Sequence, residues 1–238
     1  STEIKRLHQV HYYLKMLKGA GLMTADTELE LYTNPGEKAD SARIFREIGI
    51  LSNEKVVGIN PSATFGPAKQ WLPERFAKLA DRIRNGYGAR IIIFGGPGDR
   101  QLGNHIARNM KTDAIDLSGK TTLNQAIALI ERCHLFVTND SGLMHIAAAL
   151  NRPLVAIFGS TDYAATRPFS SRSILVRSSL PCSPCLERYC PLSHNRCMKE
   201  ITVEKVFKAS QALLERYYIT EKRIRPESAH FESPTPKT

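Results

Sequence analysis

Apolar and polar positions form two kinds of block that alternate along most of the chain. Short, continuously apolar runs, such as residues 91–94 and 154–158, are typical of strands that are covered on both faces of a sheet. Longer blocks with an apolar residue every three or four positions predict helices. The predicted strands are residues 55–59, 90–94, 114–117, 134–138, 154–158 and 174–176. The helices predicted between several of them are residues 74–84, 100–110, 123–132 and 142–150.

Strands that alternate with helices of this length predict parallel βαβ units. We therefore expect an α/β fold built on a Rossmann-like, doubly wound parallel sheet. Outside this region the pattern predicts an amphipathic helix over residues 1–17, a short strand over 29–32 and a helix over 37–48. A C-terminal helix is predicted over 202–218, with Thr202 as its N-cap, and residues 226–238 hold three prolines and predict a disordered tail.

Composition and charge narrow the class of protein. Of the 238 residues, 42% are hydrophobic and 24% are charged, which is ordinary for a globular domain with a real core. Apolar runs stay well short of the ~20 residues that span a bilayer, and the N-terminal segment carries no signal-peptide pattern, so we expect a cytoplasmic protein. The net charge of +10 favours polyanionic partners, although Lys and Arg scattered on helix faces also simply aid solubility.

The segment 139–145, Asn-Asp-Ser-Gly-Leu-Met-His, joins a predicted strand to a predicted helix. A helix that begins at the carboxyl end of a buried strand directs its unpaired N–H groups into the crevice above the sheet, where phosphates bind. Ser141 would cap this helix, Gly142 would let a ligand approach, and His145 could reach a phosphate or sugar oxygen. Asp140 would repel a phosphate, so we expect it to orient the loop or bind sugar hydroxyls. The alternative is a capped helix with His145 facing the core.

The loop 60–71 follows the first predicted strand of the alternating region. Its hydroxyl groups, Ser62 and Thr64 among them, suit phosphate oxygens, and Lys69 could neutralise a leaving diphosphate. Trp71, the only tryptophan, could contact the same ligand. The alternative is a solvated loop in which Trp71 packs in the core.

Two glycine-containing turns are weaker candidates. Residues 95–100 place Asp99 where it could bind ribose hydroxyls or an adenine amine, but they lack the G-x-G-x-x-G pattern, and Asp99 could equally be a helix N-cap. Residues 118–123 contain Gly-Lys-Thr, yet Ala114 stands where a P-loop needs glycine. We therefore expect Thr121 or Thr122 to cap the next helix instead.

Three segments in order, 65–76, 139–147 and 181–185, resemble signatures of the bacterial lipopolysaccharide heptosyltransferases of glycosyltransferase family 9, heptosyltransferase II type. This resemblance implies the C-terminal, donor-binding half of an inverting enzyme with the two-domain GT-B fold and an ADP-heptose donor. Lys69 matches the lysine at the donor phosphates, and Asp99 lies near the acidic ribose contact. The residues that match the family's D-S/T-G-x-x-H donor motif are Asp140, Ser141, Gly142 and His145.

The resemblance also implies a division of the chain. Residues 1–21 match the interdomain linker helix, 22–220 the donor-binding domain and 221–238 a disordered tail. The acceptor-binding half with its catalytic base has no counterpart here, so we expect donor binding with little transfer to the lipopolysaccharide inner core. The alternative is a non-catalytic nucleotide-sugar-binding module that acts with a separate partner chain. The expected partners are an ADP-sugar and, through the other half, a phosphorylated glycolipid at the membrane's inner face. Nucleic acid is not expected, because aromatic stacking platforms are not evident.

We expect no metal ion at the donor site, and a structural metal ion only elsewhere in the chain. The sequence has no D-x-D motif, so Lys69 and the helix N-terminus would stabilise the leaving diphosphate without a metal cofactor. The spacing of four cysteines is typical of a structural zinc or iron–sulfur site, although paired C-x-x-C motifs are absent. These residues are Cys182, Cys185, Cys190 and Cys197. Reduced thiols or a disulfide pair are the alternatives.

Overall fold

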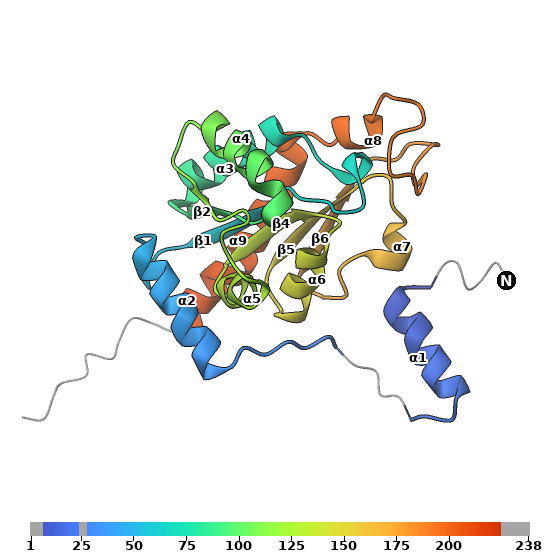
Figure 1. Ribbon diagram of the computed structural model, residues 1–238, viewed down its shortest axis with the longest axis horizontal. Coiled ribbons are helices and arrows are strands. Elements are labelled where there is room, and N and C mark those ends of the chain that lie inside the picture. The colour runs from blue at the N-terminus through green and yellow to red at the C-terminus, as the bar shows by residue number, and fades with distance from the viewer. Residues whose placement is uncertain (1–6, 24–27, 225–238) are drawn as a thin grey trace, which may run out of the picture.

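A computed structural model describes residues 7–23 and 28–224, with side chains as far as residue 218. Its centre is a six-stranded parallel sheet with the order β3-β2-β1-β4-β5-β6 (Figure 1). The strands are β1 (Val56–Asn60), β2 (Arg90–Ile93), β3 (Ile115–Asp116), β4 (Leu135–Asn139), β5 (Leu154–Phe158) and β6 (Ser173–Arg177). The doubly wound parallel sheet predicted from the sequence is confirmed, and each predicted strand of the alternating region is present.

The strand order reverses between β1 and β4, which pair with each other at the middle of the sheet. Every residue of β1, β4 and β5 is buried, because helices cover both faces of the sheet. Chain segments that leave neighbouring strands in opposite directions open a crevice at the carboxyl ends of those strands. The loops after β1 and β4 therefore meet at the place where such folds bind ligands.

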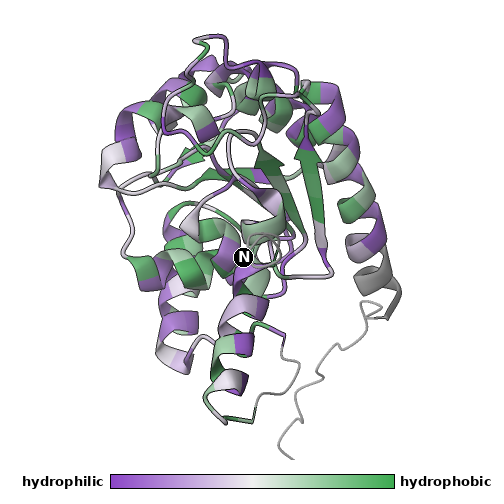
Figure 2. Cartoon of the chain, turned by 90° about the vertical axis from the view of Figure 1, so that its right-hand side faces the viewer, coloured by the Kyte–Doolittle hydropathy of each residue, from purple (hydrophilic) through white to green (hydrophobic). Residues whose placement is uncertain are grey.

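Two groups of helices cover the sheet, one on each face. One face is covered by α3 (Pro73–Tyr87), α4 (Arg100–Asn109) and α9 (Val203–Ile224), and the other by α2 (Pro35–Glu47), α5 (Leu123–Glu131) and α6 (Gly142–Ala149). Figure 2 shows the strands as almost wholly hydrophobic between these helices, whose outer surfaces are hydrophilic. Each face thus has its own hydrophobic core.

The helix α1 (Gln9–Gly19) lies beside the main body, and all of its residues are partly or fully exposed (Figure 1). His8, just before the helix, contacts the backbone carbonyl of Arg167 through Nε2 at 2.8 Å. The rings of His8 and His11 also pack on Phe169. The helix predicted over 1–17 is thus present from residue 9 onward, while residues 1–6 lie outside the described part.

The short strand predicted over residues 29–32 is wrong. This segment has no strand pairing in the described chain, and Leu31 instead donates a single backbone hydrogen bond to the carbonyl of Ala149, 3.1 Å away. The C-terminal helix is longer than predicted, since α9 continues to Ile224. Its predicted N-cap is consistent with the hydrogen bond from the Lys205 N–H to Thr202 Oγ1 at 3.2 Å. The predicted tail, 226–238, lies outside the described residues.

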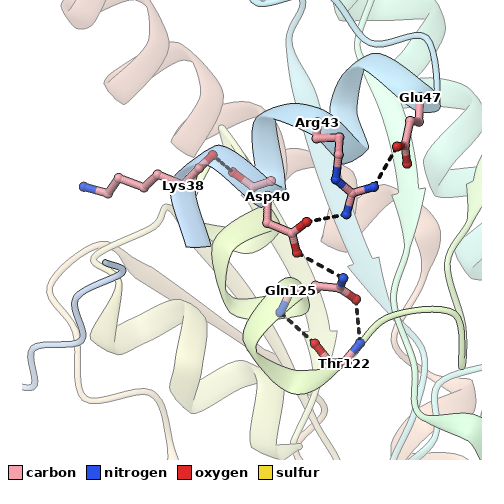
Figure 3. A network of polar contacts seen from close by, with 7 residues as sticks. Lys38, Asp40, Arg43, Glu47, Thr122 and Gln125 are labelled. Atoms are coloured by element: carbon pink, nitrogen blue, oxygen red, sulfur yellow. Dashed lines mark hydrogen bonds and ion pairs between the residues drawn. The ribbon is translucent and has the colours of Figure 1, made fainter. Parts of the chain in front are cut away.

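A side-chain hydrogen bond joins α2 to α5 on one face of the molecule (Figure 3). Gln125 Nε2 donates to the Asp40 carboxylate at 3.0 Å, and Asp40 also pairs with Arg43 one turn away. Gln125 closes a capping box with Thr122, the N-cap of α5. The prediction that a threonine caps this helix is confirmed, and residues 118–123 therefore form a cap rather than a P-loop.

Candidate functional site

Two asparagines at the ends of β1 and β4 tie the middle of the sheet together. Asn60 is fully buried, and its Nδ2 donates to Ser141 Oγ at 2.7 Å and to Thr138 Oγ1 at 3.0 Å. Asn139, also fully buried, donates from Nδ2 to the carbonyl of Pro61 at 2.7 Å. The loop after β1 and the loop after β4 are thereby held against each other.

Lys69 and Asp140, which the sequence places far apart, form an ion pair across this crevice. Lys69 lies in the short 3-10 helix η2 (Pro67–Lys69), and its Nζ is 2.8 Å from Asp140 Oδ2. The Lys69 side chain is 15% exposed and that of Asp140 only 6% exposed. Thr161 Oγ1 donates to the same carboxylate oxygen at 2.7 Å, and the Phe65 ring lies 4.9 Å from the Lys69 Nζ. Three loops, after β1, β4 and β5, therefore fix one ammonium group.

The helix α6 begins at the same place. Ser141 is its N-cap and accepts a hydrogen bond from the Met144 N–H at 3.4 Å, as predicted, and Gly142 is exposed at the first turn. His145 lies one turn further and is partly buried. Burial lowers the pKa of His145 below 6.5, and the Asp140 carboxylate opposes this shift. The imidazole is therefore neutral near pH 7, so any interaction with an anion comes from an N–H group rather than from a full charge.

The other predicted donor residues lie around this centre with different exposure. Ser62 is nearly buried, and its N–H donates to Asn60 Oδ1 at 3.3 Å, whereas Thr64 is exposed. Asp99 follows β2 and accepts a hydrogen bond from the Gly96 N–H at 2.8 Å, so its carboxylate stabilises its own turn. It is also the N-cap residue of α4, without a side-chain bond to that helix.

The structure places Trp71, which the sequence offered either as a donor contact or as a core residue, in the core. Trp71 is 1% exposed, and its ring packs edge-on against Phe76 with 5.0 Å between the ring centroids. Its indole N–H donates to the carbonyl of Ile201 at 2.8 Å. The backbone N–H of Trp71 donates to Asn139 Oδ1 at 3.1 Å. Trp71 therefore anchors the end of the loop that carries Lys69, as the core alternative states.

Sequence reasoning missed Thr161 and Phe65, both of which contact the ion pair. A signal for Thr161 existed, because it follows the predicted strand 154–158 and so belongs at the same edge of the sheet as the other site loops. Phe65 is 47% exposed, and its ring lies beside Lys69. An apolar residue in a polar loop does not by itself indicate such a contact.

Comparison with known proteins assigns this arrangement to a family. The model of glycosyltransferase family 9 (heptosyltransferase) matches residues 2–195. The chain belongs to this family. Lipooligosaccharide heptosyltransferase 2 of Campylobacter jejuni is 39% identical over 176 residues, which are 71% of this chain and 54% of the relative. Lipopolysaccharide heptosyltransferase 2 of Escherichia coli K12 is 33% identical over 216 residues, which are 86% of this chain and 61% of the relative.

Solved structures agree with the family and its fold. The structure of E. coli ADP-heptose LPS heptosyltransferase II matches with a TM-score of 0.70 and 33% identity, over 82% of this chain and 56% of that one. The iron-containing heptosyltransferase TibC matches with a TM-score of 0.55 at 20% identity, over 70% of this chain and 47% of that one, and shares the fold. The heptosyltransferase family and GT-B-type fold expected from the sequence are confirmed.

The chain spans about half the length of the curated relatives that it matches. Among the helices of the described residues, none has the length and apolarity required to cross a membrane.

Proposed function

We propose that this chain is the donor-binding half of a lipopolysaccharide heptosyltransferase and that it binds ADP-heptose in the crevice between β1 and β4. The whole enzyme would transfer L-glycero-D-manno-heptose to the lipopolysaccharide inner core with inversion at the anomeric carbon. The observation that carries this proposal is the Lys69–Asp140 pair, which lies beside the N-terminus of α6 at the topological switch point of the sheet.

Lys69 is the residue that we assign to the leaving group. An ammonium group has three N–H bonds, and Asp140 accepts one of them, so the others remain for diphosphate oxygens. Asp140 and Thr161 keep the ammonium in place, which reduces the ordering cost when the donor binds. As the bond between the anomeric carbon and the phosphate oxygen breaks, negative charge grows on the diphosphate. Lys69 and the α6 N-terminus stabilise that charge in the role that a metal ion has in other transferases.

The remaining donor contacts follow from exposure and position. Gly142 and Ser141 present the first turn of α6 to the phosphates, and His145 donates a hydrogen bond from its neutral ring to a phosphate or sugar oxygen. Thr64, exposed in the β1 loop, adds a hydroxyl group, with Ser62 behind it. Asp99, on the loop after the neighbouring strand β2, accepts hydrogen bonds from the ribose hydroxyls.

The acceptor of the whole enzyme would be a phosphorylated glycolipid at the inner face of the cytoplasmic membrane. The net charge of +10 supports this placement, because a basic protein is attracted to an anionic surface.

Calorimetric titration of the purified chain with ADP, ADP-heptose, UDP and GDP tests the proposal. We expect ADP and ADP-heptose to bind, and UDP and GDP to bind more weakly. A charge-assisted hydrogen bond contributes about 1.5–3 kcal/mol, so Lys69→Ala should weaken ADP binding by about 10- to 100-fold.

The matched control is Lys208→Ala, which removes an exposed lysine of α9 that pairs only distantly with Glu204, at 3.8 Å. It should leave ADP binding unchanged. Equal affinity of the wild-type chain and Lys69→Ala for ADP would refute the assignment of Lys69. Absence of any ADP or ADP-heptose binding would refute the donor site itself.

A further inference from the structure

A small cavity lies behind the loop that carries Lys69. It has a volume of about 30 Å³ and is lined by Ala68, the neighbour of Lys69, and by the loop between β6 and α8 (Arg196–Lys199). The thiol-bearing residues around it are Cys182, Cys185, Cys190 and Cys197. A space of this size holds one water molecule or one ion.

The backbone around these cysteines turns at three left-handed residues. Leu186, immediately after Cys185, has φ +62°, and Ser193 and Asn195 have φ +55° and +47°. A non-glycine residue in this left-handed region costs roughly 1–2 kcal/mol, so other interactions must hold the loop in this shape. One result of the bend is that the Asn195 N–H points at Cys190 Sγ, at 3.4 Å.

All four cysteines line this one small cavity, so their thiols share a common space. Four adjacent thiolates repel one another unless a cation lies between them.

The cavity also has polar walls without partners. Among the described residues, Ser160 Oγ and Asn195 Oδ1 are buried and have no hydrogen-bond partner, and both residues line this cavity. Ser160 is 1% exposed. Buried polar groups are normally satisfied, so two unpaired atoms beside one small space indicate an occupant.

We propose that Cys182, Cys185, Cys190 and Cys197 bind one thiophilic metal ion, zinc or iron, in this cavity. Four sulfur ligands favour these metals over magnesium or calcium, which prefer oxygen. Each thiol releases its proton when it binds the ion. In the part of the chain that is described, no three Cys, His, Asp or Glu side chains are already arranged as a metal-ligand set, so the thiols must turn toward a common centre.

The ion would be structural and would support the donor site from behind. The backbone carbonyl of Arg188, between Cys185 and Cys190, accepts a hydrogen bond from the Ala68 N–H at 3.2 Å. On the other side, the Leu186 N–H donates to the carbonyl of Ser160 at 2.7 Å, next to Thr161. The cysteine loop therefore contacts the two segments that carry Lys69 and the hydroxyl group bound to Asp140.

Metal analysis of the untagged chain tests this proposal independently of donor binding. The chain is purified under reducing, oxygen-free conditions, and zinc and iron are measured by plasma mass spectrometry. We expect about one metal ion per chain, and the separate zinc and iron measurements identify which of the two it is. Titration of the metal-free chain with Co²⁺ should give intense thiolate-to-cobalt absorption that saturates at about one equivalent.

The double variant Cys182→Ser/Cys185→Ser should lose the ion, whereas Cys133→Ala should keep it, because Cys133 is a fully buried thiol outside the loop. A chelator should lower the melting temperature of the wild-type chain and leave that of the double variant unchanged. If the variant does not fold, the Co²⁺ titration of the wild-type chain decides. A reduced wild-type chain that binds neither zinc, iron nor cobalt would overturn the proposal, and so would a folded double variant that retains the ion.

Discussion

Gly58, in the buried strand β1, has no room for a side chain. An ideal Cβ at this position would lie 2.5 Å and 2.8 Å from two carbons of the Phe136 ring and 2.9 Å from a carbon of Phe94. Carbon atoms pack best at about 3.5–4.0 Å, so Gly58→Ala forces both rings to move. Neither ring has free space, because they are 0% and 1% exposed and pack against each other at 5.5 Å between centroids.

The expected cost follows from this overlap. Overpacking of a rigid core costs about 1–3 kcal/mol, and three close contacts place Gly58→Ala in the upper part of that range. Alanine recovers about 0.5–1 kcal/mol through the lower entropy of its unfolded chain, which leaves a net loss of about 1–2.5 kcal/mol in the free energy of unfolding. For a domain of this size, the melting temperature should fall by roughly 2–4 °C per kcal/mol.

Gly86→Ala is the matched control, since it makes the same chemical change where nothing lies within 4 Å of the added Cβ. Gly86 is exposed in the last turn of α3, so alanine should raise stability slightly, by up to about 0.5–1 kcal/mol. Urea unfolding followed by circular dichroism measures both variants. A Gly58→Ala chain with a urea midpoint equal to or above that of the wild type would refute the packing argument.

Three further predictions concern the site and its supports. Thr161→Val removes the hydroxyl group that donates to Asp140, so calorimetry should show about three- to tenfold weaker ADP binding, with Thr161→Ser close to wild type. Trp71→Phe loses the hydrogen bond to Ile201 and leaves a void, which should lower the urea-derived free energy of unfolding by about 2–4 kcal/mol. Because the folded-state pKa of His145 is lowered, the unfolded chain binds its proton first, and stability falls as the pH drops from about 7.5 to 5. His145→Gln should show a shallower fall in urea midpoint over that range, and an unchanged slope would contradict the assigned shift.

The regular parts of the fold could be predicted because they depend on local pattern. The continuous apolar runs of β2 and β5 and the regular spacing of the helices required no knowledge of distant contacts. The strand predicted over residues 29–32 is absent because the structure of this segment depends on distant contacts. Its apolar residues resemble those of a strand, but the Leu31 side chain packs against the core on the α2, α5 and α6 face of the sheet. The Leu31 N–H donates to the carbonyl of Ala149, which lies in a helix rather than in the sheet.

The sequence was sufficient to predict several residues of the site, but not which residues contact one another. The strand-to-helix turns identified Lys69, Asp140 and Ser141, because their place follows from topology. The environment of Trp71 was not readable, because its partner Ile201 is far away in sequence. The same holds for Thr161, whose role depends on the direction of one side chain after β5.

The hydrogen bond between Ala68 and Arg188 has a consequence for how the protein is made. The strands β1 to β5 all precede the cysteine loop in the chain, so during synthesis they leave the ribosome before the segment that contacts the Lys69 loop. The Lys69 loop therefore reaches its final position only when the cysteine loop docks against Gly66, whose added Cβ would lie only 2.4 Å from Arg188 Cγ.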